Sequence, residues 1–308
     1  MSDVKTPAFK NSSETIGAVI NEALMFKKEN RWKEIWRRLK KDRVAMAGLF
    51  IIGFMILAAL AAGLLVSYEV AIKMNLKLRL SPPSAGHWFG FDGYGRDLLA
   101  RCLHGARVSL LIGFASSFAT LAVGSILGAL VGYLGGKLDD LVMRALDIFS
   151  SIPDILFAMA VVAALGPGIF NICFAISLNY IPNFVRIVRS SVLNIAEQEY
   201  IEAAKAGGAS TPHILFKHVL PNTVGILIVQ TTANVASIIL IAATLSFLGL
   251  GINPPQPEWG ALVSEGKEFL RVAPHLILIP GFMICISSFA MSVLGDGLRD
   301  ALDPRLRR

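Results

Sequence analysis

Four side chains in one short stretch of the sequence are of the kinds that bind metal ions. They are His87, Asp92, Asp97 and His104, and the first three lie in a segment rich in glycine and aromatic residues. Imidazole nitrogens and carboxylate oxygens bind zinc and related ions, but such sites use compact, recurring ligand spacings. The spacing here matches no such site, so we expect a structured turn and no metal.

Two carboxylates, Asp147 and Asp154, lie seven residues apart near the start of a long apolar segment. On one continuous helix they would share a face, and carboxylates inside a membrane can relay protons. A relay needs further groups deeper in the segment, and the sequence has none there. We therefore expect anchoring or helix-end electrostatics, with Arg144 as a partner for Asp147, and keep proton coupling as the alternative.

The sequence lacks the common signatures of nucleotide and hydrolytic chemistry. Its Gly-Lys pairs are followed by Leu138 and Glu268, whereas a phosphate-binding P-loop needs Ser or Thr at that position. It also has no Gly-x-Ser-x-Gly elbow and no His-Glu-x-x-His helix. We therefore expect no enzyme and no cofactor, and energy for an active process must come from another protein.

The composition is that of an integral membrane protein. Of 308 residues, 54% are hydrophobic and only 17% are charged, and the mean hydropathy is +0.61. A soluble domain of this size carries more charge. The three cysteines, Cys102, Cys173 and Cys285, are too widely spread for a disulfide framework or a metal site, so we expect them to be small apolar residues.

Long uncharged runs predict an all-α, polytopic fold with six transmembrane helices. A helix rises about 1.5 Å per residue, so roughly 20 apolar residues cross the hydrocarbon core. Gly166-Pro167-Gly168 divides one long run into two helices, and Pro280 predicts a kink in the last span. The expected spans are 44–66, 108–136, about 147–165, about 169–186, about 224–248 and about 272–295.

Lys and Arg are distributed unequally between the two expected sides of the membrane. With the N-terminus inside, 21 of the 29 basic residues lie on the cytoplasmic side, which predicts that both termini are cytoplasmic. The expected regions are a cytoplasmic tail at 1–43, a first span at 44–66, an extracytoplasmic loop at 67–107, a permeation core at 108–295 that contains a cytoplasmic loop at 187–221, and a cytoplasmic tail at 296–308.

Residues 31–43 have the pattern of an amphipathic helix on a membrane surface. Trp32, Ile35, Trp36 and Leu39 fall on one helical face, and Lys and Arg residues surround them. Such a helix binds an anionic leaflet through its aromatic side chains and its cations. A nucleic-acid-binding arm is the alternative, but two tryptophans beside a span favour lipid, and we expect no nucleic acid.

Two of the expected spans carry stripes of unusual residues. In the second span, small residues recur every fourth position, which lets another helix approach closely, either in a dimer or within the same subunit. The fifth span has a polar face that could line a translocation path, or could simply form hydrogen bonds between helices. The small residues are Ser116, Thr120, Gly124, Gly128, Gly132 and Gly136, and the polar ones are Gln230, Asn234, Ser237 and Thr244.

A polar segment, Glu199–His213, lies between two long apolar segments and has the composition of a contact surface. Residues 199–206 favour a helix, Gly207-Gly208 ends it, and Thr211 as an N-cap followed by Pro212 predicts a second short helix. Its many alanines and glycines would let another protein approach the backbone closely. An interfacial helix that binds lipid, the plain alternative, would carry Trp, Phe and Leu instead.

Within this segment, Glu202-Ala203-Ala204, followed by Gly208 and later by Val219-Leu220-Pro221, resembles the loop with which permease subunits of ATP-driven importers dock a cytoplasmic ATPase. His218 stands where that loop usually has an aliphatic residue. The resemblance implies that Glu202, Ala203, Ala204, Gly208 and Pro212 couple this chain to an ATPase.

Further segments resemble the oligopeptide, dipeptide and nickel permease family, and in particular its second, C-type subunit. The resemblance covers nearly all of the chain after about residue 35, with Phe91 in place of the usual Thr. The segments are Gly90–Asp97, Arg107–Leu110, Phe247–Gly251, Pro254–Gly260 with its Glu258-Trp259-Gly260, and Gly295–Pro304.

This resemblance implies a permease subunit of an ATP-binding-cassette importer for peptides or related small solutes in a bacterial inner membrane. It implies as partners a homologous second permease, two ATP-binding subunits and an extracytoplasmic solute-binding protein. A secondary transporter or channel that works without an ATPase, using Asp154 and the polar fifth span, is the alternative. A carrier of that kind does not need the loop around Glu202, so this loop distinguishes the two functions.

Overall fold

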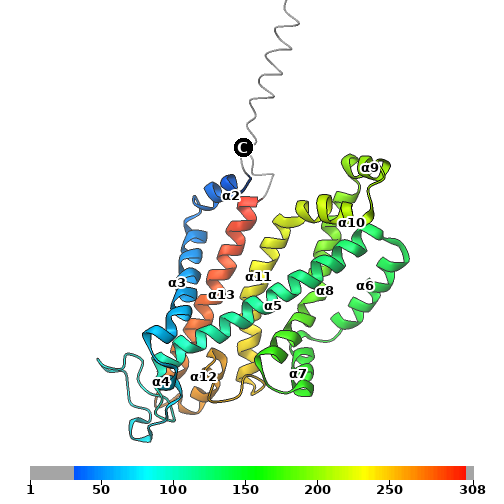
Figure 1. Cartoon of the computed structure of the whole chain (residues 1–308). Coiled ribbons are helices and arrows are strands. Elements are labelled where there is room, and N and C mark those ends of the chain that lie inside the picture. The colour runs from blue at the N-terminus through cyan, green and yellow to red at the C-terminus, as the bar shows by residue number, and fades with distance from the viewer. Residues whose placement is uncertain (1–30, 303–308) are drawn as a thin grey trace, which may run out of the picture.

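The computed structural model describes residues 31–302, and this part of the chain is mainly helical, with irregular loops and without β-strands (Figure 1). The all-α prediction is therefore confirmed. The helices are α2 (Arg31–Leu39), α3 (Arg43–Leu65), α4 (Tyr68–Ile72), η1 (Leu76–Leu78), α5 (Leu98–Leu134), α6 (Gly136–Ser150), α7 (Asp154–Leu165), α8 (Ile169–Ala196), α9 (Glu199–Ala206), α10 (Thr211–Ile214), η2 (Leu215–Val219), α11 (Leu220–Phe247), α12 (Trp259–Gly266), η3 (Lys267–Phe269) and α13 (His275–Leu302).

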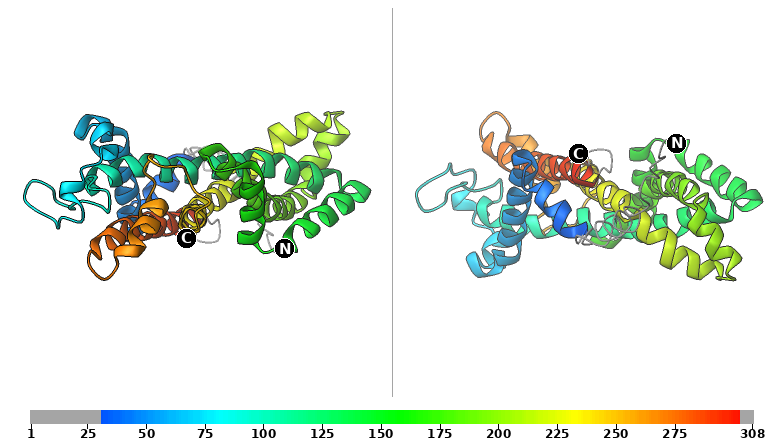
Figure 2. Two further views of the ribbon diagram at one scale, coloured as in Figure 1. Left: turned by 90° about the horizontal axis from the view of Figure 1, so that it is seen from below. Right: turned by 90° about the horizontal axis from the view of Figure 1, so that it is seen from above.

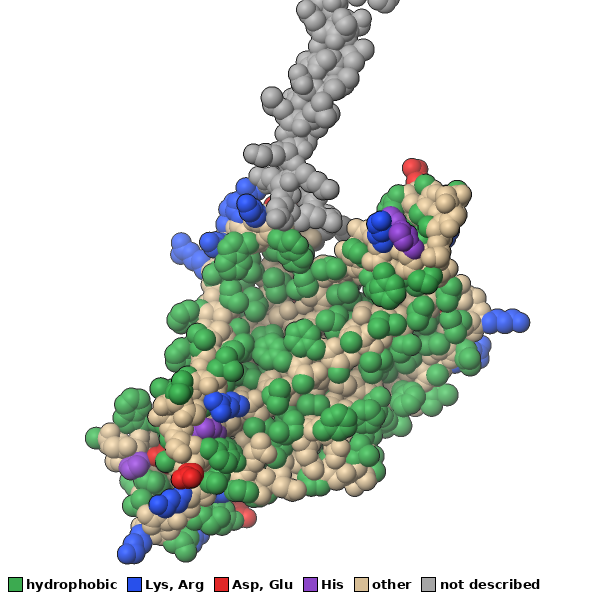
Figure 3. Space-filling view, viewed as in Figure 1, with side chains coloured by type: hydrophobic (Ala, Val, Ile, Leu, Met, Phe, Trp, Pro, Cys, Tyr) green, Lys and Arg blue, Asp and Glu red, His purple; other side chains and the backbone are tan. Residues whose placement is uncertain are grey.

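The long helices run between two ends of the molecule. Helices α2, α9 and α10 and the last turn of α13 lie at one end, and α4 and α12 lie at the other (Figure 1). Seen along this direction, the helices form an elongated layer, with α3 and α13 towards one side and α6 and α8 towards the other (Figure 2). Hydrophobic side chains cover most of the visible flank between the ends, as expected for a surface in contact with lipid (Figure 3).

Within residues 31–302, four stretches of helix are long and apolar enough to cross a membrane, and the pair α6–α7 makes a fifth if it is one broken span. The four are Arg43–Leu65, Leu98–Leu134, Thr211–Phe247 and His275–Leu302. The fold is therefore that of a polytopic membrane protein, and the count of six spans stays a prediction. Helix α8 corresponds to the fourth expected span, at about 169–186, and its polar residues and arginines lower its hydropathy.

The small-residue stripe of the second expected span packs within the same subunit. A β-carbon at Gly124 would lie 2.8 Å from the ring of Phe184, and one at Gly132 would lie 2.9 Å from the carbonyl oxygen of Arg189. Both contacts are made with α8, and Ser116 and Thr120 on the same face are fully buried. The stripe therefore allows α5 and α8 to pack closely. Gly136 lies beyond the end of α5 and takes no part.

The leading helix α3 is joined to the core by close packing and by hydrogen bonds. A β-carbon at Gly48 would lie 2.7 Å from the carbonyl oxygen of Ala290 in α13. At the other end of α3, the Arg107 guanidinium of α5 donates to the carbonyl oxygens of Ala59 and, over 2.7 Å, Leu60. These carbonyls belong to the last turns of α3, and a cation there also stabilises the helix dipole.

The structure corrects three expected helix boundaries. Helix α5 begins at Leu98, ten residues before the expected 108, because the Asp97 side chain caps it by accepting from the amide of Ala100. The surface helix expected over 31–43 ends at Leu39, and Asp42 caps the new helix α3. Helix α8 continues to Ala196, beyond the expected end near 186.

The expected third span is broken. Helices α6 and α7 meet at an angle of 86°, because Pro153 cannot continue α6 and stands directly before α7. Asp147 lies in α6 and Asp154 opens α7, so the prediction that they share a helical face was wrong. Asp147 also pairs with Arg186 of α8, at 2.8 Å between Nη2 and Oδ1, and not with the expected Arg144.

Candidate coupling loop and translocation face

Helix α9 ends in a left-handed turn at Gly208. The amide of Ala209 donates to the carbonyl of Ala204 over 3.1 Å, and the amide of Gly208 donates to the carbonyl of Lys205 over 3.0 Å. This pair of bonds is the Schellman motif, in which glycine takes the position with positive φ, here +78°. A β-carbon at Gly208 would meet no atom within 4 Å, so the turn is constrained by its backbone conformation and is open to a partner.

One face of α9 is anchored to the core and the other is exposed. Ile201 is fully buried in a cluster with Phe184, Val188 and Ile214, and the Lys205 ammonium lies 5.0 Å from the centre of the Tyr133 ring. The opposite, exposed face consists of Glu202, Ala203, Ala206, Gly207 and Gly208. The core thus holds a small-residue surface at the end of the molecule where α2 also lies (Figure 1).

The second short helix of the loop, α10, starts with Ser210 as its N-cap, and not with Thr211 as expected, and Pro212 lies in its first turn. It continues through the π-helical turn η2 into α11 without a break in the helix. His218 is half-buried, and its ring lies 6.4 Å from that of Tyr200 and 5.8 Å from that of His213, measured between centres. The histidine therefore packs between the two short helices and keeps them together.

The polar residues of α11 are not equivalent. Gln230 donates from Nε2 to Oδ1 of Asn234 over 3.0 Å, and Asn234 is buried. Ser237 is exposed, while the hydroxyl of Thr244 donates to the carbonyl oxygen of Leu240 in the preceding turn over 2.8 Å. On this face, the two amides bond to each other. The Ser237 and Thr244 hydroxyls donate to backbone carbonyls, and their oxygens can still accept a hydrogen bond.

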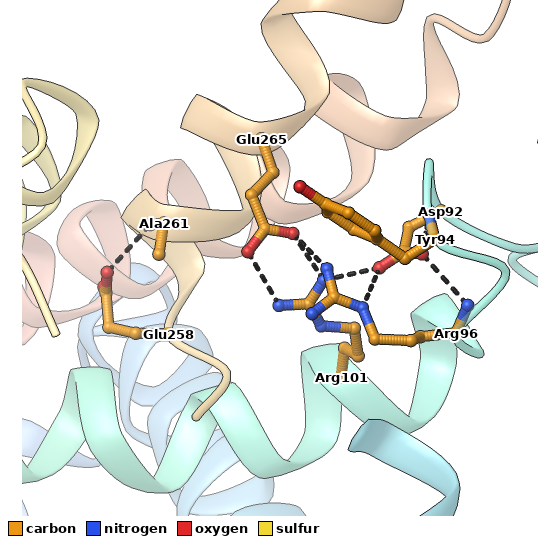
Figure 4. Close-up of polar contacts among 7 residues, drawn as sticks. All are labelled: Asp92, Tyr94, Arg96, Arg101, Glu258, Ala261 and Glu265. Atoms are coloured by element: carbon orange, nitrogen blue, oxygen red, sulfur yellow. Dashed lines mark hydrogen bonds and ion pairs between the residues drawn. The ribbon is translucent and has the colours of Figure 1, made fainter. Parts of the chain in front are cut away.

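At the other end of the molecule, two arginines and two carboxylates form a buried cluster that the sequence did not predict (Figure 4). Arg96 donates from Nε to Asp92 over 2.7 Å, and both Arg96 and Arg101 contact Glu265 of α12. Arg101 also donates to Asp92. The side chains of the two arginines are 2% and 1% exposed, so this is an ion network inside the protein.

The electrostatics of Asp92 follow from this network. Burial by itself would raise the pKa of Asp92, but the Arg101 and Arg96 charges and the backbone amides of Arg96 and Tyr94 lower the pKa below its ordinary value of 3.8. The carboxylate is therefore ionised and ties the loop before α5 to the helix that follows α11. The role of Glu265 could not be predicted from a local pattern, because its partners lie more than 160 residues away along the chain.

Glu258-Trp259-Gly260 joins α12 to α5. Glu258 caps α12 by accepting from the amides of Gly260 and Ala261, both over 2.9 Å, and it also accepts from the Ser109 hydroxyl over 2.9 Å. The Trp259 indole is fully buried and donates to the carbonyl oxygen of Cys102 over 3.0 Å. Gly260 lies against the backbone of Ala243, where a β-carbon would come within 2.6 Å. This motif therefore acts in packing.

The four potential metal ligands between residues 87 and 104 have other roles. His87 contacts Asp97 over 2.7 Å between Nδ1 and Oδ2, and His104 contacts the carbonyl oxygen of Val66 over 2.8 Å. Asp92 belongs to the ion network. Within residues 31–302, no group of three or more His, Cys, Asp or Glu side chains is placed to hold a metal ion.

The sequence of this chain matches known protein families. Residues 124–308 match the family described as the binding-protein-dependent transport system inner membrane component. The chain belongs to this family. Residues 30–83 of the permease also match the N-terminal transmembrane domain of oligopeptide transport permease C, which agrees with a leading span before the core.

Several curated proteins resemble the permease over most of its length. It is 45% identical over 276 residues to the dipeptide transport system permease protein of Alkalihalophilus pseudofirmus, covering 90% of both chains. It is 41% identical over 276 residues to a glutathione transport system permease protein of Escherichia coli, covering 90% of this chain and 91% of the relative. It is 39% identical to the oligopeptide transport system permease protein of Bacillus subtilis, covering 97% and 98% of the two chains.

The fold of the permease is also found in a solved transporter. An inward-facing structure of the MetNI methionine ABC transporter contains a chain that matches with a TM-score of 0.56 and 20% identity, covering 66% of this chain and 96% of that chain. The permease is therefore a multi-pass inner-membrane transport subunit of an ABC importer and not an enzyme. Family membership implies that it works with a partner permease, ATPase subunits and a substrate-binding protein.

Proposed function

We propose that this permease forms half of the translocation pathway of an importer for peptides or related small solutes. Its relatives by sequence are named for dipeptides, oligopeptides and glutathione, which share a peptide backbone with charged ends. The second half would be a homologous permease. Two cytoplasmic ATP-binding subunits and an extracytoplasmic solute-binding protein would complete the assembly.

The exposed surface of α9 and the turn after it is the observation that carries the coupling proposal. Glu202, Ala203, Ala204, Gly208 and Pro212 form or shape the loop that docks an ATPase. Ala204 is half-buried and supports the surface, while Glu202, Ala203, Gly208 and Pro212 are exposed. Ile201 and Lys205 join this surface to α8 and α5, so pressure on the loop would move the long helices as a unit.

The arrangement of the two ends of the molecule supports a proposed orientation for the permease. Helices α2 and α9 and the last turn of α13 share one end, and the basic residues are concentrated there in the sequence. We assign this end to the cytoplasm. Trp32 and Trp36 of α2 are exposed, and the Lys40 ammonium lies 5.2 Å from the centre of the Trp36 ring, so this helix would rest on anionic lipid.

Polar residues of α11 would line the pathway. Gln230, Asn234, Ser237 and Thr244 lie on a helix that otherwise has an apolar composition, and polar groups at membrane depth need water, a partner or a solute. Ser237 is exposed in the single chain, and Thr244 is half-buried. A second permease opposite this face would enclose the path between two such helices.

Reconstitution tests the proposed function directly. Proteoliposomes that contain the permease with its partner permease, its ATPases and its binding protein should take up trialanine when ATP is supplied on the cytoplasmic side. The permease alone should hydrolyse no ATP and should transport nothing. Uptake by the permease alone, driven by a proton gradient, would show instead a secondary transporter and would contradict the proposal.

A further inference from the structure

A cavity of about 270 Å³ lies beside the break between α6 and α7 and opens against the middle of α8. Its lining is unusually polar for a chain in which only 17% of the residues are charged. Asp154 contributes a carboxylate, Arg186 a guanidinium, Asn179 and Asn183 their amides, and Tyr180 a phenol. A carboxylate and a guanidinium that face the same cavity can form charge-assisted hydrogen bonds to a ligand with charged groups of its own.

Arg186 is held in place but keeps most of its donors free. It donates from Nη2 to Asp147 over 2.8 Å and, also from Nη2, to the Ser150 hydroxyl over 3.0 Å. Within residues 31–302, Nε and Nη1 of Arg186 make no hydrogen bond. Arginine has five N–H donors in a planar fork, which suits two-point binding of a carboxylate. The ion pair with Asp147 thus fixes the side chain and leaves donors for a second carboxylate.

Asp154 is the complementary group of this cavity. It opens α7, where the preceding Pro153 supplies no side-chain cap, and it is exposed. Within the described chain, the carboxylate forms no ion pair, with Arg186 or with any other cation. An ionised carboxylate accepts hydrogen bonds but cannot donate them, so its natural ligand is a cation with several N–H groups.

The cavity also meets the polar face of α11. Tyr180, which lines the cavity, lies beside Ser237, one of the residues proposed to line the pathway. On its other side, the cavity is bounded by Phe149 and Phe157, whose rings meet edge to face with centres 5.9 Å apart. A ligand in this space would therefore have an anion and a cation at hand, amides between them, and an aromatic wall for an apolar side chain.

We propose that this cavity binds a short peptide as a zwitterion during its passage, with Arg186 taking the terminal carboxylate and Asp154 the terminal ammonium. This inference rests on the proposed function and assigns the residues that would recognise its substrate class. Asn179 and Asn183 can bond to the peptide backbone, which is common to all short peptides, and the aromatic wall tolerates different side chains. The site would therefore select charged ends and not a particular sequence.

The test uses the complete importer in proteoliposomes, supplied with saturating binding protein loaded with radiolabelled trialanine, so that the affinity of the binding protein does not limit uptake. The variants are Asp154→Asn, which removes the anion, and Arg186→Lys, which keeps the charge beside Asp147 but removes the planar fork. The matched control is Asp140→Asn, because Asp140 is an exposed carboxylate on α6 outside the cavity. Recovery of the partner subunits with each variant measures assembly.

We expect Asp154→Asn and Arg186→Lys each to lower uptake about tenfold, since each loses a charge-assisted hydrogen bond, while Asp140→Asn keeps wild-type uptake. Asp154→Glu, which restores the carboxylate, should recover much of the lost uptake. Wild-type uptake in both cavity variants would overturn the inference. Loss of uptake together with loss of the partner subunits would also overturn it, because the cavity would then be a subunit contact. If the wild-type importer takes up no trialanine, the proposed function fails instead.

Discussion

Val188 of α8 lies so close to Gly128 of α5 that a β-carbon on residue 128 would be 2.7 Å from the Val188 β-carbon. The carbonyl oxygen of Val185 would lie only 2.8 Å away, and backbone atoms cannot move aside as a side chain can. Glycine at this position is therefore required by the packing of the two helices. The same contact decides that the stripe of small residues joins helices of one subunit.

Gly128→Ala is therefore expected to destabilise the permease by about 1–3 kcal/mol, the usual cost of overpacking, despite the better helix propensity of alanine. The matched control is Gly53→Ala in α3, where a β-carbon would meet no atom within 4 Å. This control should be neutral or slightly stabilising. Thermal unfolding of the two variants in the same detergent measures both effects, and equal midpoints would contradict the packing argument.

Removal of the Asp92 charge should destabilise the end of the molecule where α4 and α12 lie. Asp92→Asn leaves Arg101 and Arg96 buried beside a neutral side chain, and breaking a buried ion pair from one side costs about 3–5 kcal/mol. The pKa of Asp92 is lower in the folded state, so its contribution is present above pH 3.8 and is lost as the pH falls through the folded pKa.

A pH series of thermal midpoints separates this contribution from others. The wild-type midpoint should fall as the pH drops below 3.8, while Asp92→Asn should start lower and lose less over the same range. The difference between the two proteins should therefore shrink on acidification. A difference that stays constant with pH would show that Asp92 acts through its shape and not through its charge.

Substitutions on the exposed face of α9 should uncouple transport while the protein remains inserted in the membrane. Gly208→Glu places a bulky charged side chain in a left-handed turn that faces outward, and Glu202→Lys reverses the charge of the same surface. Uptake of trialanine by the complete importer and recovery of the ATPase subunits with the permease are measured together. Each variant should lose both the uptake of trialanine and the recovery of the ATPase subunits.

Two milder variants show whether bulk and charge on this surface cause the loss of uptake and of ATPase recovery. Gly208→Ala adds the same backbone strain without bulk or charge, and Glu202→Gln keeps the shape of the side chain. Both should keep most of the ATPase recovery. Normal uptake and undiminished ATPase recovery in Gly208→Glu and Glu202→Lys would mean that the loop is only a connection between helices.

The proposed orientation can be tested by labelling single cysteines in a variant that lacks Cys102, Cys173 and Cys285. Ser210 is exposed beside α10, and Glu268 is exposed in η3 near the opposite end, so both positions are accessible to reagents. An impermeant thiol reagent applied to intact spheroplasts should label Glu268→Cys and not Ser210→Cys. The reverse pattern would place the α9 loop outside the cell and contradict the orientation.

Local sequence patterns were enough to predict the class of this protein and its main segments. Hydropathy runs longer than the hydrocarbon thickness predicted membrane helices, and Gly207-Gly208 with Pro212 predicted two short helices, because glycine and proline restrict the backbone locally. The resemblance to the family could also be seen in the sequence, because each of its motifs is a continuous stretch of residues. These features depend on neighbours along the chain.

Contacts between residues far apart in the sequence became visible only in the tertiary structure. The Glu265 carboxylate contacts Arg101, 164 residues away, and Arg186 contacts Asp147 across 39 residues, so no local pattern indicates either pair. The break at Pro153 moved Asp154 away from Asp147 and placed it in a cavity opposite α8. Charges were visible in the sequence, but their partners and their burial depend on how the helices cross, and contacts such as that of Gly128 with α8 form only in the folded chain.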